Sequence, residues 1–197
     1  MGGSHRQNEG IPKIKGILAG RTGKRRDGEV GMDFREMAVS ILFPRCCPVC
    51  GEIVQPRGEL ICPQCVGHLS PVRQPVCLKC GKEVESSQME YCFDCTRHPR
   101  SFERNFALLN YNEAASDSMA AVKYKNKREF LDFYGQALCL RYGNMLKSIN
   151  PDVIVPVPVH SSRERIRGFN QAEKQAEWAF RHTVGHYAFR TPSGQTT

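Results

Sequence analysis

The sequence has no apolar run long enough to span a bilayer. Its longest apolar run near the start, Met37 to Phe43, is interrupted by Ser40, whereas a membrane helix needs about 20 apolar residues. A basic segment, an apolar core and a small-residue cleavage site do not occur in the order of a signal peptide. A mean hydropathy of -0.46 with 24% charged residues also favours a soluble globular protein. We therefore expect a cytoplasmic protein without membrane insertion.

The net positive charge of the chain says little about its function. The 197 residues carry a formal net charge of +8, and residues 1–31 hold half of it. We predict that 1–31 form a disordered basic extension, for which a solvated tail is a simpler interpretation than nucleic-acid contact. Met32 is a candidate start just before the first structured-looking segment. Eight zinc-bound thiolates would bring the remainder close to neutral. Global basicity alone does not indicate nucleic-acid binding.

Cysteines are scarce outside one segment and dense within it. Nine of the ten lie between Cys46 and Cys95, and eight of these form four Cys-x2-Cys pairs with an internal period of 30 residues. Two such pairs complete a tetrahedron around Zn²⁺, and a segment so poor in large apolar residues needs metal to fold. The predicted ligands of two zinc ions are Cys47, Cys50, Cys62 and Cys65, then Cys77, Cys80, Cys92 and Cys95.

Several details of this metal assignment stay open at the sequence level. We prefer sequential pairing of the four Cys-x2-Cys turns over an interleaved arrangement, although spacing does not decide it. Cys46 could replace Cys47 as a ligand, and Cys139 is most simply a small apolar residue in a helix. A disulfide framework suits this chain less well because it shows no export signal. A redox role and iron–sulfur ligation also fit this spacing less well.

Beyond Arg100 the pattern becomes that of alternating helices and strands. The expected elements are a strand over 106–111, a helix over 113–124, a helix with an apolar stripe over 131–149, a buried strand over 152–160, an arginine-rich loop, and a helix over 171–180. We expect no element in 182–197. This order opens an α/β unit, but one strand cannot make a parallel sheet, so the domain looks incomplete.

The loop after the 152–160 strand concentrates positive charge. It follows the C-terminal end of a strand, where open α/β sheets bind ligands, and it precedes a helix N-terminus. Guanidinium groups in this setting favour a phosphate or pyrophosphate ligand over a nucleobase, because we expect no place for a flat ring there. A solvated loop is the alternative on charge alone. The predicted ligand-binding residues are Arg163, Arg165, Arg167, Gly168, Asn170 and Gln171.

Four motifs together resemble the ComF family. They are Leu-Phe-Pro followed by Cys-Pro-x-Cys-Gly in 42–51, a second Cys-x2-Cys-Gly, Val-Pro-Val-Pro-Val-His in 155–160, and Arg-Gly-Phe-Asn-Gln in 167–171. The resemblance implies a small zinc-stapled double ribbon over 38–100, followed by a partial α/β domain of the type I phosphoribosyltransferase kind over 101–197. It also implies that 156–171 hold the pyrophosphate of phosphoribosyl pyrophosphate, and a link to competence and DNA uptake. Lys123-Tyr124-Lys125 resembles a Lys-Tyr segment of the family.

The sequence departs from the family in its acidic residues. It has no adjacent acid pair and no acid after Glu177, whereas the family places two acids and a Thr-Thr-Gly turn at the ribose and its Mg²⁺. We therefore expect a C-terminally truncated member in which no catalytic residue is identified, enzymatic activity is left open, and Mg²⁺ belongs only to a full-length enzyme. The expected ligand is weakly bound phosphoribosyl pyrophosphate or pyrophosphate.

Two other functions remain as alternatives. One is an adaptor for proteins of the DNA-uptake machinery or for single-stranded DNA, contacted by a short basic stretch with one aromatic ring. A solvated helix junction is the simpler interpretation of that stretch. The other alternative is a non-functional gene fragment. The stretch comprises Lys123, Tyr124, Lys125, Lys127 and Arg128.

Overall fold

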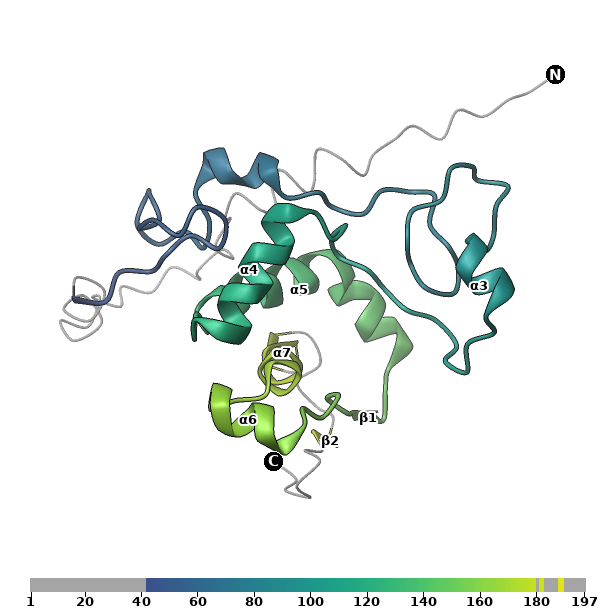
Figure 1. The fold of residues 1–197 in the computed structure, drawn as a ribbon. Coiled ribbons are helices and arrows are strands. Elements are labelled where there is room, and N and C mark those ends of the chain that lie inside the picture. The colour runs from purple at the N-terminus through teal and green to yellow at the C-terminus, as the bar shows by residue number, and fades with distance from the viewer. Residues whose placement is uncertain (1–41, 180, 183–187, 190–197) are drawn as a thin grey trace.

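A computed structural model describes residues 42–179, 181–182 and 188–189, so the predicted extension over 1–31 lies outside the described residues. The two cysteine-rich segments lie on opposite sides of the helical region (Figure 1). The first contains the short helix η1 (Pro63–His68), and the second contains α3 (Phe93–Arg97). The helical region comes next, with α4 (Glu113–Tyr124), α5 (Phe130–Ile149), α6 (Ser161–Arg167) and α7 (Gln171–Ala179).

Helices α4 and α5 confirm the helices expected over 113–124 and 131–149. Asn112 caps the first turn of α4, because its side chain accepts a hydrogen bond of 3.1 Å from the amide of Ala115. Asn150 follows the last residue of α5 and takes the left-handed conformation at φ 50° before Pro151. The buried side of α5 includes Leu131 and Tyr134, the first two residues of the predicted stripe, and it faces the molecular core, whereas Ile149 at the end of the stripe is 52% exposed.

The expected strand over 106–111 is wrong. Only Leu109 pairs, as an isolated antiparallel bridge to Pro71. Two further backbone hydrogen bonds tie this segment to residues 70–72, from Val72 to Leu108 at 3.2 Å and from Asn110 to Ser70 at 2.7 Å. The segment is extended, but its partner is too short for a ladder.

The expected buried strand over 152–160 is also wrong in most of its length. Strand β1 (Val153–Ile154) pairs in parallel with β2 (Ala188–Phe189), and this pair is the only sheet among the described residues. Val155 and Val157 are 65% and 74% exposed. Proline has no amide hydrogen, so Pro156 and Pro158 cannot extend the ladder.

The C-terminal elements bring two more corrections and one confirmation. Strand β2 lies in the 182–197 range, where we expected no element. The arginine-rich loop is helix α6, capped by the His160 side chain, which accepts from the Ser162 amide, and ended by Gly168 at φ 72°. Helix α7 confirms the predicted helix from Gln171, with residue 180 outside the described residues. The region after the two cysteine-rich segments is therefore mainly helical, and the expected α/β sheet is seen only in the two-residue pair.

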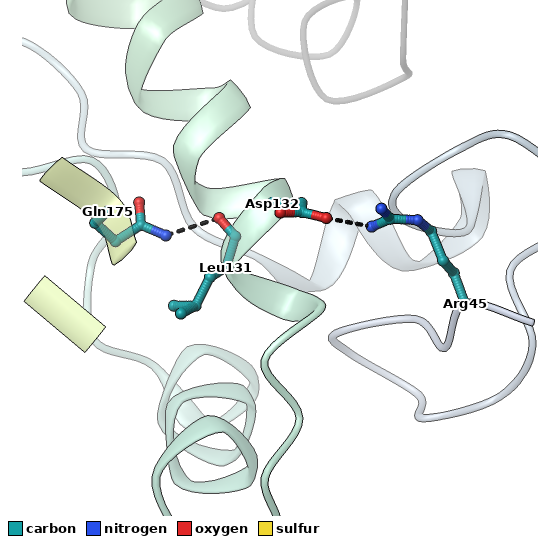
Figure 2. A network of polar contacts seen from close by, with 4 residues as sticks. All are labelled: Arg45, Leu131, Asp132 and Gln175. Carbon is teal, nitrogen blue, oxygen red and sulfur yellow. Dashed lines mark hydrogen bonds and ion pairs between the residues drawn. The ribbon is translucent and has the colours of Figure 1, made fainter. Parts of the chain in front are cut away.

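Helix α5 contacts the first cysteine-rich segment on one side and helix α7 on the other. Figure 2 shows the Asp132 carboxylate receiving a hydrogen bond of 2.6 Å from Arg45 of the first cysteine-rich segment. On its other side, the Leu131 carbonyl accepts a hydrogen bond of 2.7 Å from Gln175 of α7. In the part of the chain that the structure describes, no helix is both long and apolar enough to cross a membrane.

Replacement of Gly135 by Ala should destabilise the helical region. A Cβ there would lie 2.6 Å from a ring carbon of Trp178, so α5 and α7 would have to separate. Overpacking of this kind costs about 1–3 kcal/mol, more than the gain in helix propensity of about 1 kcal/mol. Denaturant unfolding of Gly135→Ala measures this, with Gly67→Ala as the control because a Cβ at Gly67 meets nothing within 4 Å. Equal stability of the two variants would contradict the close packing.

Candidate metal centres and basic pocket

The eight predicted metal-ligating cysteines lie in two sets of four. In each set, the ligand atoms all lie within 4.8 Å of one another, and the sets agree with the sequential pairing rather than the interleaved one. We call them the first cluster and the second cluster. The first cluster comprises Cys47, Cys50, Cys62 and Cys65, and the second comprises Cys77, Cys80, Cys92 and Cys95.

The backbone repeats the 30-residue period seen in the cysteines. The amide of Gly51 donates to the Cys47 carbonyl at 2.9 Å, and the amide of Gly81 donates to the Cys77 carbonyl at 2.9 Å. Both glycines have positive φ, 78° and 74°, which closes the Cys-x2-Cys turn in a conformation that other residues rarely adopt. A Cβ at Gly81 would also lie 2.8 Å from the Asn105 carbonyl. The duplication is therefore structural as well as sequential.

The donor set and its spacing fit Zn²⁺. In the second cluster, the Sγ atoms of Cys80 and Cys92 lie 3.6 Å apart. A tetrahedron with zinc–sulfur bonds of about 2.3 Å has edges of about 3.8 Å. No disulfide joins any of the ten cysteines. Two tetracysteine clusters are thus consistent with two Zn²⁺ ions.

The thiols of each cluster have opposing pKa shifts. Burial opposes ionisation of Cys77, but hydrogen bonds from the backbone amides of Cys80 and Cys92 outweigh it and lower its pKa to about 6. Burial, followed by the neighbouring thiols of Cys50 and Cys47, raises the pKa of Cys65 to about 12. Four thiolates so close together repel one another, so all four can ionise only with a bound cation. This is the electrostatic setting of a metal site.

The two clusters differ in their surroundings. Three cysteines of the first cluster belong to the same buried core as residues of α4 and α5, including Val122, Phe130 and Leu131. Cys77 and Cys92 of the second cluster are buried as well, but they lie outside that core. The first metal centre is therefore part of the helical core, and the second stabilises a segment at the edge of the molecule.

Cys46 has a partner other than the metal. Its sulfur accepts a hydrogen bond of 3.5 Å from the ammonium group of Lys127. This bond is the main reason that the pKa of Lys127 lies above its usual value. Cys46 does not belong to the first cluster, so the structure favours Cys47 as the ligand.

A second candidate site is a basic pocket where the end of α4 meets α6. Its volume is about 410 Å³. The expected phosphate-binding residues Arg163, Arg165, Arg167 and Gly168 all line it. The other lining residues are Val122, Lys123, Tyr124, Asn126, Ile166 and Phe169.

Asn170 and Gln171 have structural contacts instead of lining the pocket. The buried Asn170 side chain accepts from the Ala172 amide at 3.0 Å, within the first turn of α7. The side-chain oxygen of Gln171 accepts a hydrogen bond of 3.3 Å from the Arg167 guanidinium. The side-chain nitrogen of Gln171 is buried and has no hydrogen-bond partner among the described residues.

Sequence reasoning did not assign Tyr124 and Lys123 to the same site as the arginines. The resemblance noted their motif, but only the fold brings the end of α4 close to α6. Two other members of the basic stretch are occupied elsewhere: Lys127 contacts Cys46, and Arg128 donates to the Arg167 carbonyl at 3.3 Å. The predicted basic stretch is thus divided between structural contacts and the pocket.

Comparison with known families supports the metal centres. Residues 38–96 match the family model of the double zinc ribbon domain. No curated protein and no solved structure matches the chain significantly. The chain therefore contains a double zinc ribbon domain that carries both tetracysteine clusters.

Elemental analysis of protein purified without chelator should find two zinc ions per chain. Cys62→Ser and Cys92→Ser should each reduce this to one, because each removes a ligand from a different cluster. Cys46→Ser is the matched control and should retain two, since Cys46 contacts Lys127 rather than the cluster. Loss of a zinc ion in Cys46→Ser, or fewer than one zinc ion in the unmodified chain, would contradict the assignment.

Proposed function

We propose that this chain is a ComF-type protein in which a double zinc ribbon supports a helical region that binds the pyrophosphate group of phosphoribosyl pyrophosphate. The observation that carries the proposal is the basic pocket, which coincides with the segment that resembles the family's pyrophosphate loop. The link to competence and DNA uptake rests on the same resemblance. The double zinc ribbon domain agrees with it.

The charge of the pocket suits a polyanion. Four of its lining residues are basic (Lys123, Arg163, Arg165 and Arg167), and none of the described residues that line it is acidic. Guanidinium groups bind phosphate oxygens through pairs of hydrogen bonds, which makes them stronger and more directional ligands than isolated charges. The site therefore offers both the charge and the donors that a diphosphate needs.

Two of the three arginines are available to a ligand. The side chains of Arg163 and Arg165 make no hydrogen bond or ion pair with other described residues. Arg167 instead donates to Gln171, and its guanidinium lies 5.6 Å from the centre of the Tyr124 ring. We infer that Arg167 maintains the shape of the pocket and that Arg163 and Arg165 contact the phosphates.

We propose binding rather than group transfer for these residues. The family's transfer reaction uses Mg²⁺ held at the ribose by adjacent acids, and this sequence has no adjacent acid pair. No acidic side chain lines the pocket among the residues described there. Binding to this pocket should accordingly change little with Mg²⁺ and weaken as salt screens the arginines.

Arg163→Ala should weaken the binding of inorganic pyrophosphate about tenfold or more. Loss of one charge-assisted hydrogen bond costs about 1.5–3 kcal/mol, and each 1.4 kcal/mol is about a tenfold change in affinity. Calorimetric titration with and without Mg²⁺ measures it. Arg100→Ala removes the same charge next to the second ribbon and should leave the affinity unchanged. Equal losses in both variants would indicate a general charge effect and count against the pocket.

A further inference from the structure

Tyr124 is an exposed aromatic residue at the edge of the basic pocket. It is the last residue of α4, it lines the pocket, and it is 77% exposed. The guanidinium of Arg167 lies 5.6 Å from the ring centre, a distance at which the cation attracts the face of the ring and orients it. Packing in the core does not explain this ring, because most of it lies in solvent.

The pocket also has an apolar wall. Ile166 of α6 lines the cavity and is 87% exposed, and Val122 and Phe169 are buried behind it. The guanidinium of Arg128 covers the Phe169 ring at 4.4 Å and helps to keep it in place. Our expectation that there is no place for a flat ring considered the arginine segment alone. In the structure α4, which is distant in sequence from the arginines, adds an aromatic ring to the same pocket.

We propose that the basic pocket binds a nucleotide, with the diphosphate on Arg163 and Arg165 and the base against Tyr124 and Ile166. This inference rests on the proposed binding of a pyrophosphate group and adds the chemical class of the remainder of the ligand. A cavity of about 410 Å³ lies within the range of about 300–1,000 Å³ typical of small-molecule sites. The arginine side chains on one side of the pocket suit the diphosphate of a nucleoside diphosphate, and the exposed aromatic ring on the other side suits its base.

The base should add measurably to the affinity. Stacking of a base on an aromatic side chain depends little on which base it is, and it raises the affinity about tenfold or more. The structure predicts this gain for any ligand that joins a base to a diphosphate through one sugar. The gain requires the ring of Tyr124 but not its hydroxyl group, for which the described residues provide no hydrogen-bond partner in the pocket.

Two matched ligands isolate the contribution of the base. Adenosine diphosphate and ribose 5-diphosphate share the sugar and the diphosphate and differ in the base alone. Titration of the full chain should give about tenfold tighter binding of adenosine diphosphate. Tyr124→Ala should remove this preference, so that the two ligands bind about equally, whereas Tyr124→Phe should retain it. Because Tyr124 is mostly exposed, both variants should fold, which circular dichroism checks.

The possible outcomes separate this inference from the proposed function. If Arg163→Ala weakens both ligands and Tyr124→Ala removes only the advantage of adenosine diphosphate, both proposals stand. If the two ligands bind equally well, or the preference survives in Tyr124→Ala, the nucleotide site is wrong while the pyrophosphate site stands. If neither ligand nor inorganic pyrophosphate binds, the proposed function itself is wrong.

Discussion

Three of the four cysteines of the first cluster lie in the hydrophobic core of the helical region, and the rest of the structure depends on this placement. Its buried cysteines share the core with Phe130 and Leu131 at the start of α5. Without a cation, four mutually repelling thiols at this place would oppose the packing of the helix; with Zn²⁺ they become a rigid anchor. The ion pair of 2.6 Å between Arg45 and Asp132 joins the same two elements. Both side chains are partly exposed, so it contributes orientation more than stability.

The same junction connects the first metal centre to the basic pocket. Lys127 contacts Cys46, next to a cysteine of the first cluster. The next residue, Arg128, donates to the Arg167 carbonyl and lies over the Phe169 ring. One short connection between α4 and α5 therefore contacts the ribbon on one side and the wall of the pocket on the other. This arrangement gives the double ribbon a role beyond its own folding, because it positions the segment against which α6 packs.

The sequence predicts those parts of the structure that are determined by residues close together in the chain. Cysteine spacing predicts both clusters because each Cys-x2-Cys turn is local, and apolar periodicity predicts α5 because one stripe suffices to bury a helix. The predictions of strands over 106–111 and 152–160 are wrong because a strand also needs a partner strand, and the sequence does not reveal how long that partner is. The prediction of a loop in place of α6 is wrong because it rested on the arginines alone and overlooked the residues that cap a helix at each end, His160 and Gly168. Tyr124 lines the same pocket as the arginines because the end of α4 lies near α6 in the fold, for which the sequence has no local signal.

Thermal unfolding of the helices in two cysteine variants tests the dependence of the helical region on the first cluster. Circular dichroism would compare Cys62→Ser with Cys92→Ser, each of which removes one buried ligand from a different cluster. The first should destabilise the helices by about 3 kcal/mol or more, because loss of that metal disrupts the shared core. The second should leave their transition within about 1 kcal/mol of the unmodified chain, because it removes only a peripheral support. Equal destabilisation by the two variants, or an unchanged helical transition in Cys62→Ser, would contradict the account.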